Sequence, residues 1–102
     1  MADTYKMPTH WDLMNPLLQA LHDLGGSGSI DEINQNVTAS LDLPEEMLDQ
    51  PHDPEKTSRT EIEYRLAWAR NYLKNYGILE NSSRGVWAIL PDKQHITAVD
   101  PN

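Results

Sequence analysis

Apolar residues recur at helical intervals in three stretches of the chain, and capping residues bound each stretch. The first stretch predicts a helix from about Thr9, a suitable N-cap, to Gly25-Gly26, where glycine favours termination. Its apolar face consists of Leu13, Leu17, Leu21 and Leu24. Pro16 lies inside this stretch. Either Asn15 is therefore the true N-cap, or the helix kinks at the proline.

A capping box, Ser29-Ile30-Asp31-Glu32, predicts the start of a second helix. Its inward residues are expected to be Ile30, Ile33, Val37 and Leu41. The glycine-rich residues 25–28 before it are predicted to form a flexible connector, and residues 43–48 fit one further helical turn. Residues 49–57, with two prolines, are expected to form a long loop.

The third helix is predicted to run to about Tyr76 and to end at Gly77. Two registers fit its start: a capping box from Ser58 to Glu61, or one from Thr60 to Glu63. The predicted buried stripe consists of Ile62, Leu66, Ala69, Leu73 and Tyr76.

Short apolar runs at residues 78–80 and 86–90 predict two strands of a hairpin, with a turn over residues 81–85. Its tip carries Ser82, Ser83 and Arg84, and Gly85 is expected to supply a positive φ. Three helices and a hairpin predict a mainly α fold, a winged helix-turn-helix with a small β-hairpin as the wing. A small helical bundle with an unrelated hairpin is the alternative. We expect a flexible leader at residues 1–8, one domain at 9–91, and a tail at 92–102 or a linker to a further C-terminal domain.

Charge is distributed unevenly along this acidic chain, whose formal net charge is −8. Residues 1–55 carry eleven acidic residues and one lysine, whereas residues 56–102 carry seven basic and five acidic residues. Such a polarity weakens non-specific binding to nucleic acid but permits local phosphate contacts from the second half.

The predicted third helix presents a polar face opposite its buried stripe, at Thr60, Glu63, Ala67, Asn71 and Lys74. A neighbouring ridge is formed by Arg59, Glu63, Arg70 and Lys74. A helix in the DNA major groove requires basic side chains that contact phosphates, polar side chains that hydrogen-bond to the edges of the DNA bases, and a small residue at the closest approach. A solvated helix face with charge pairs is the alternative. The candidate DNA contacts are Thr57, Ser58, Arg59, Thr60, Glu63, Arg65, Ala67, Trp68, Arg70, Asn71, Lys74, Ser82, Ser83 and Arg84.

Two aromatic residues of this helix, Trp68 and Tyr72, share a flank with Arg65. We expect this flank to pack against Trp87 and the hairpin, which makes a structural role more favoured than base stacking.

Several blocks of the sequence resemble the N-terminal domain of Mrr-type restriction endonucleases, over roughly residues 7–91. They are Met7-Pro8-Thr9, residues 13–18, Leu24-Gly25-Gly26, residues 64–74, residues 77–80, and Ser83-Arg84-Gly85-Val86-Trp87. The resemblance implies a winged-helix DNA-binding domain, joined to a Mg²⁺-dependent nuclease domain that cleaves modified DNA. The motif positions are Arg65, Trp68, Arg84, Gly85 and Trp87.

The chain lacks the residues of an enzymatic or metal site. It has no cysteine, its four histidines are scattered, and no (D/E)-x-K tripeptide of the nuclease type occurs. We therefore expect a non-catalytic domain that requires no cofactor. No apolar run approaches the roughly 18 residues of a membrane span, so a soluble, cytoplasmic protein is expected.

The favoured hypothesis is a module that binds double-stranded DNA, with modified cytosine or adenine as the target that the resemblance implies. Its other expected partner is a nuclease domain, on the same chain or on another. Because basic contacts are few, a homodimer or a second domain would add avidity. The alternative is a protein-interaction module that uses the acidic N-terminal half.

Overall fold

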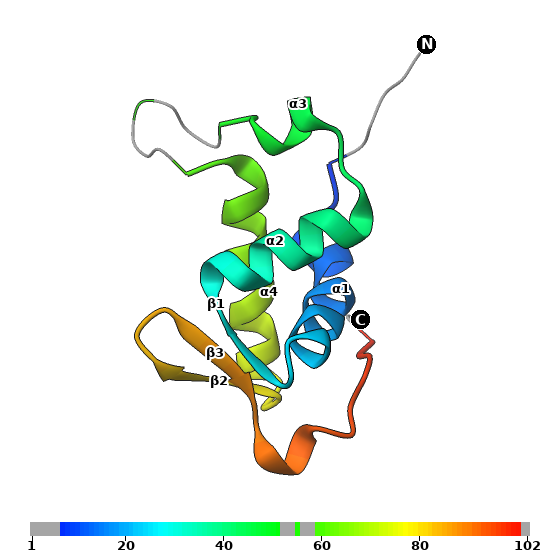
Figure 1. Ribbon diagram of the computed structural model, residues 1–102, viewed down its shortest axis with the longest axis vertical. Helices are drawn as coiled ribbons and strands as arrows, with labels where there is room; N and C mark the ends of the chain where they lie inside the picture. The colour runs from blue at the N-terminus through cyan, green and yellow to red at the C-terminus, as the bar shows by residue number, and fades with distance from the viewer. Residues whose placement is uncertain (1–6, 52–54, 56–58, 101–102) are drawn as a thin grey trace.

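The computed structural model describes residues 7–51, 55 and 59–100. These residues form four α-helices and a three-stranded antiparallel sheet (Figure 1). The elements are α1 (His10–Asp23), β1 (Ser27–Ser29), α2 (Ile30–Leu41), α3 (Glu45–Leu48), α4 (Glu61–Asn75), β2 (Leu79–Ser83), β3 (Val86–Ile89) and the 3-10 helix η1 (Pro91–Lys93). The predicted fold class is confirmed: the protein is mainly helical, with a small sheet consistent with a winged-helix-like fold.

The core lies where α1 crosses α4, and α2 and the sheet close it from two sides (Figure 1). Leu13, Leu17 and Leu21 of α1 are fully buried, as the periodicity predicted. Leu66 and Leu73 of α4 are fully buried against them. Tyr76, predicted to end the buried stripe, is instead 43% exposed, because α4 ends at Asn75 and the chain turns away at Gly77. The predicted inward position of Leu41 is likewise wrong, since this residue is exposed at the end of α2.

Reciprocal capping boxes begin the three long helices. Thr9 caps α1, and the helix continues through Pro16, so the alternative cap at Asn15 is wrong. Ser29 caps α2, as predicted. At α4, Thr60 and Glu63 form the box, which confirms the second of the two registers. The further turn predicted within residues 43–48 is α3.

We expect Thr60→Ala to lower the free energy of unfolding by about 1 kcal/mol. The Thr60 hydroxyl accepts a hydrogen bond from the Glu63 amide at 3.3 Å, which satisfies one of the unpaired amides at the start of α4. Urea unfolding followed by circular dichroism measures the loss. Thr97→Ala, at an exposed position outside the helices, is the matched control. Equal stabilities of the two variants would contradict the assigned start of α4.

The sheet differs from the predicted hairpin in two respects. Residues 27–29, predicted to lie in a flexible connector or to begin the second helix, form the strand β1. This strand pairs with β3, so the strand order is β1-β3-β2. The strand β2 extends to Ser83, with an irregular register between Glu80 and Ser83, so the turn contains only Arg84 and Gly85. The expected positive φ of Gly85 is confirmed at 74°.

After β3, residues 91–100 return along α1 (Figure 1). The Asn15 side chain forms two hydrogen bonds with the Val99 backbone, at 2.7 and 3.0 Å. His22 Nε2 donates to the Ile96 carbonyl at 2.7 Å. These contacts hold the segment on the side of α1 that faces away from the sheet's β2–β3 turn.

No helix in the described ranges has the length and apolar character needed to cross a membrane.

Candidate nucleic-acid interface

The polar face of α4, defined by Thr60, Glu63, Ala67, Asn71 and Lys74, lies at the surface as the sequence predicted. Glu63, Asn71 and Lys74 are exposed, and Thr60 and Ala67 are half-buried. Ala67, at the middle of this face, carries the smallest side chain, so a ligand can approach the helix most closely there. Arg59 is exposed just before the helix, and the rise of about 1.5 Å per residue separates it from Lys74 by roughly 20 Å.

A groove of about 210 Å³ runs between α2 and the first half of α4. Its polar lining consists of Asn34, Gln35 and Thr38 from α2, with Thr60 and Glu63 from α4. Glu63 Oε1 already accepts a hydrogen bond from the Thr60 amide at 2.9 Å, which fixes the orientation of the carboxylate. A carboxylate has acceptor capacity for further bonds, so the capping role leaves Glu63 able to accept from a ligand.

Arg70 does not lie on the exposed ridge where the sequence placed it. It is only 5% exposed, and its Nη1 donates to Asn34 Oδ1 of α2 at 3.1 Å. Its guanidinium carbon lies 6.0 Å from the centroid of the Trp87 ring on β3, a cation–π distance. Burial, and secondarily repulsion by Arg59, lower the pKa of Arg70 to about 10. Arg70 therefore connects α2, α4 and the sheet from inside.

Arg65 and Trp68 lie on the flank of α4 that faces α1, and the prediction that they pack against Trp87 and the hairpin is wrong. Arg65 Nε donates to Glu61 Oε2 at 2.6 Å, and its Nη1 donates to the Met7 and Pro8 carbonyls at 3.2 and 3.0 Å. Trp68 lies 6.1 Å from Tyr72, ring centroid to ring centroid. Both side chains thus belong to the contact between α4 and the beginning of α1.

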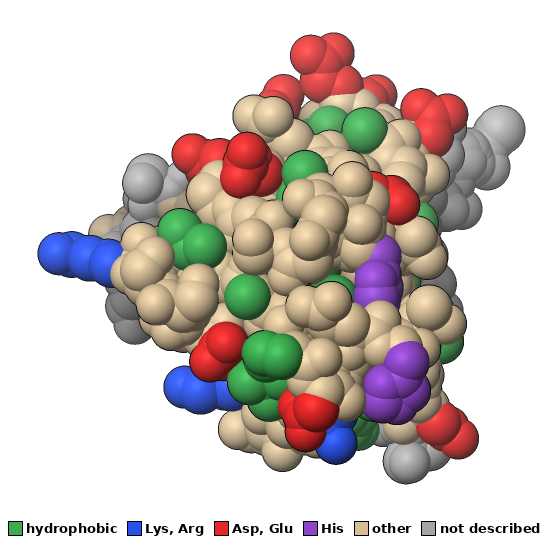
Figure 2. Space-filling model, turned by 60° about the horizontal axis from the view of Figure 1, so that its bottom comes forward, with side chains coloured by type: hydrophobic (Ala, Val, Ile, Leu, Met, Phe, Trp, Pro, Cys, Tyr) green, Lys and Arg blue, Asp and Glu red, His purple; other side chains and the backbone are tan. Residues whose placement is uncertain are grey.

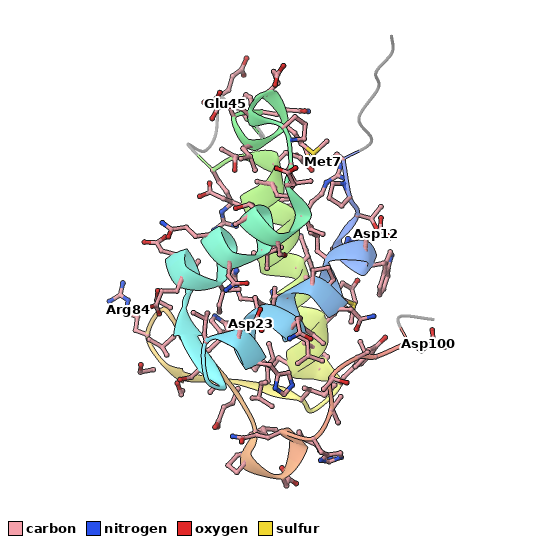
Figure 3. The ribbon with its side chains drawn as sticks, turned by 45° about the vertical axis from the view of Figure 1, so that its right-hand side comes forward. Met7, Asp12, Asp23, Glu45, Arg84 and Asp100 are labelled. Atoms are coloured by element: carbon pink, nitrogen blue, oxygen red, sulfur yellow. The ribbon has the colours of Figure 1, made fainter. Side chains whose placement is uncertain are left out.

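The turn between β2 and β3 forms the wing. Arg84 projects outward from it (Figure 3), and Ser82 and Ser83 are exposed at the end of β2. The Asn81 side chain donates to the carbonyls of Ser83 and Val86, at 2.9 and 2.7 Å, and so bridges the irregular part of the hairpin. This role of Asn81 was not predicted, although Asn beside a Gly-containing turn is a recognisable signal.

The wing turn is joined to the helical part of the interface. The Ile30 amide, the first of α2, donates to the Gly85 carbonyl at 3.0 Å. This bond places Arg84 beside the start of α2. Asp31 and Glu32 in the first turn of α2 interact favourably with the helix dipole, but their negative charges would repel a phosphate. Among the described residues, the exposed basic side chains at this surface are Arg59, Lys74 and Arg84.

Two predicted contacts, Thr57 and Ser58, lie outside the described residues. On the surface that Figure 2 presents, several acidic side chains lie along the upper edge, and acidic and basic side chains are interspersed in the lower half. In the described ranges, no group of three His, Asp or Glu side chains is arranged to hold a metal ion.

Comparison with known proteins identifies one family. The family model described as the Mrr N-terminal domain matches residues 11–96, which is most of the chain. None of the curated proteins or solved structures compared with the chain matches it.

Proposed function

The chain belongs to the Mrr N-terminal domain family, which indicates a role in a restriction system, and we propose that within it this domain binds double-stranded DNA. The observation that carries the proposal is the surface formed by the polar face of α4, the groove beside α2 and the wing turn. The roughly 20 Å between Arg59 and Lys74 exceeds the major-groove width of about 12 Å. Basic side chains at the two ends of α4 can therefore reach phosphates on both sides of the groove.

Each contact has a chemical role in this proposal. The phosphates are contacted by the basic side chains of Arg59, Lys74 and Arg84. Hydroxyl groups that can hydrogen-bond to the DNA backbone are supplied by Thr57, Ser58, Ser82 and Ser83. Glu63 accepts a hydrogen bond from a cytosine amino group, and Asn71 pairs with an adenine edge. The C5 position of cytosine faces the major groove, and the small Ala67 side chain leaves room there for a methyl group on C5.

Three of the candidate residues act indirectly. Arg70 is buried, and Arg65 and Trp68 face α1, so these side chains position α4 rather than contact a base. The proposal assigns cleavage to a nuclease domain, on this chain or a partner, because no catalytic constellation is formed by the described residues. A homodimer would align two such surfaces and increase avidity.

A fluorescence-anisotropy titration tests the proposal. The duplexes carry unmodified cytosine, 5-methylcytosine, 5-hydroxymethylcytosine or 6-methyladenine, and each is measured at two salt concentrations. We expect salt-sensitive binding that is tightest for one modified duplex. Absence of binding to every duplex at low salt would reject DNA binding and favour protein interaction through the acidic half of the chain.

Arg84→Ala is expected to weaken binding to all four duplexes alike. A phosphate contact carries no sequence information, so its loss lowers the slope of log K against log salt by about one unit. The slope is measured from titrations at four or more salt concentrations. Lys93→Ala, which removes the same charge from η1, is the control and is expected to leave the slope nearly unchanged. Loss of affinity for one duplex only would instead assign Arg84 to base recognition.

A further inference from the structure

Five aromatic rings form a continuous cluster on the side of the molecule away from the wing. The aromatic cluster consists of His10, Trp11, Tyr64, Trp68 and Tyr72. Tyr72 stacks on His10 at 5.0 Å between centroids and lies 4.6 Å from Trp11. Tyr64 meets Trp68 edge-to-face at 6.4 Å. Figure 3 places Met7 and Asp12, which flank the start of α1, opposite Arg84 of the wing.

Two tryptophans of this cluster remain open to solvent. Trp11 is 40% exposed and Trp68 is 43% exposed. Rings that serve only the core are buried, and adjacent exposed tryptophans on one surface are typical of a binding site. Tyr72 beneath them is half-buried and supports both.

The exposed rings line a pocket of about 320 Å³ between the beginnings of α1 and α4. Trp11 and His10 form one side of the pocket, and Tyr64 and Trp68 form the other. Its remaining lining is Thr9, Glu61 and Arg65. The pocket thus offers the faces and edges of several rings to a single inserted group, and the Glu61 carboxylate at its edge is paired with Arg65.

The charge around the pocket favours a cation. Among the described residues, Arg65 is the one arginine or lysine that lines it, and Glu61 and two backbone carbonyls already accept from its guanidinium. Asp12 follows Trp11 directly, and Figure 3 shows Asp100 on the same side of the molecule. The chain as a whole carries a net charge of −8. Cations are attracted to the faces of Trp and Tyr rings, and the surrounding acidic charge raises their local concentration.

We propose that the aromatic cluster binds an arginine side chain presented by a basic segment of a partner protein. A planar, weakly hydrated guanidinium stacks on an indole ring, whereas a lysine ammonium is a more strongly hydrated point charge. DNA would meet acidic charge at this surface. A second copy of the chain would bring further acidic charge against this surface, so self-association through the aromatic cluster is disfavoured.

The test titrates the intact 102-residue chain with a hexa-arginine peptide and, separately, with a hexa-lysine peptide of equal charge. Indole N–H signals in ¹H–¹⁵N NMR report each tryptophan, and Trp87 on β3 serves as the internal reference. We expect the Trp11 and Trp68 signals to shift, and hexa-arginine to bind about threefold to tenfold more tightly than hexa-lysine. Equal affinities, or shifts confined to Trp87, would overturn the proposal.

Trp68→Ala should reduce the affinity for hexa-arginine about threefold to tenfold, to that of hexa-lysine. Tyr76→Ala is the matched control, because Tyr76 follows the same helix and is also 43% exposed. Trp11→Ala provides a second variant from a different helix. Unchanged affinity in both tryptophan variants would reject the pocket, and sedimentation that shows a dimer lost on Trp68→Ala would assign the surface to a second copy instead.

Discussion

Replacing Arg70 with methionine is expected to stabilise the fold by about 1–4 kcal/mol, although it removes a hydrogen bond and a cation–π contact. Arg70 is 5% exposed, and burial, with a smaller contribution from Arg59, lowers its pKa to about 10. A shift of this size corresponds to a cost of roughly 3 kcal/mol for keeping the buried side chain charged near pH 7. Methionine fills a similar volume without that cost. Urea unfolding at neutral pH measures the gain.

Asn34→Ala is expected to have the opposite effect, a loss of about 1.5–3 kcal/mol. It removes the amide oxygen that accepts from Arg70 Nη1 at 3.1 Å and leaves the cation buried with less compensation. In the Arg70→Met background, the same Asn34→Ala change should cost much less, because no buried charge remains to be solvated. Additive effects of the two substitutions would contradict the assigned pairing.

The pH dependence has a definite sign. Because the folded pKa of Arg70 is lowered to about 10, the cost of burying its charge persists at every pH below about 10 and is relieved as pH rises above that value. The difference in the free energy of unfolding between Arg70→Met and the wild-type chain should therefore shrink as the pH rises above about 10. The difference between the two proteins is the quantity to measure, since tyrosines and lysines titrate in the same range.

Arg70 illustrates why the long helices could be predicted from the sequence while their contacts could not. Capping boxes and apolar periodicity are local, and they located α1, α2 and α4 to within a few residues. Arg70 lies next to the buried stripe of α4, where periodicity alone does not distinguish surface from interior. Its placement depends on Asn34, thirty-six residues away along the chain, and on Trp87 of β3.

The remaining differences have the same origin. The strand β1 is the tripeptide Ser-Gly-Ser, which carries no apolar alternation, and only pairing with β3 makes it a strand. The flank of α4 with Arg65 and Trp68 was recognised, but its partner was taken to be the hairpin. The crossing of α1 and α4 instead brings this flank to the start of α1, through the Arg65 bonds to the Met7 and Pro8 carbonyls. The polar face needed no distant partner, and its prediction was correct.

A costly buried cation beneath the polar face fits the proposed DNA-binding role. Arg70 lies one helical turn from both Ala67 and Lys74, and a buried charge is screened by salt less than an exposed one. We expect the positive potential of Arg70 to favour DNA binding at that face. Arg70→Met should therefore lower the affinity for DNA while it raises the free energy of unfolding.

Neutralising the three exposed bases of the interface together, as Arg59→Ala, Lys74→Ala and Arg84→Ala, is expected to weaken DNA binding about 10²–10³-fold at 0.1 M salt. Each phosphate contact contributes about 0.9 to the slope of log K against log salt. Three contacts therefore raise the binding constant at 0.1 M salt by about 2.7 decades relative to its value at 1 M salt. The slope itself should fall by nearly three units. All three residues are exposed in the structure, so the thermal stability of the variant should remain close to that of the wild type.

Anisotropy titrations of the triple variant over a range of salt concentrations measure both quantities. Lys93→Ala is the single-charge control, since it removes one positive charge away from the polar face and is expected to lower the slope much less than the triple variant does. A triple variant that still binds with the wild-type slope would place the DNA on another surface. Restoration of affinity by Arg59→Lys in place of Arg59→Ala would assign that position to phosphate, whereas failure of lysine to substitute would indicate bidentate recognition of guanine by Arg59.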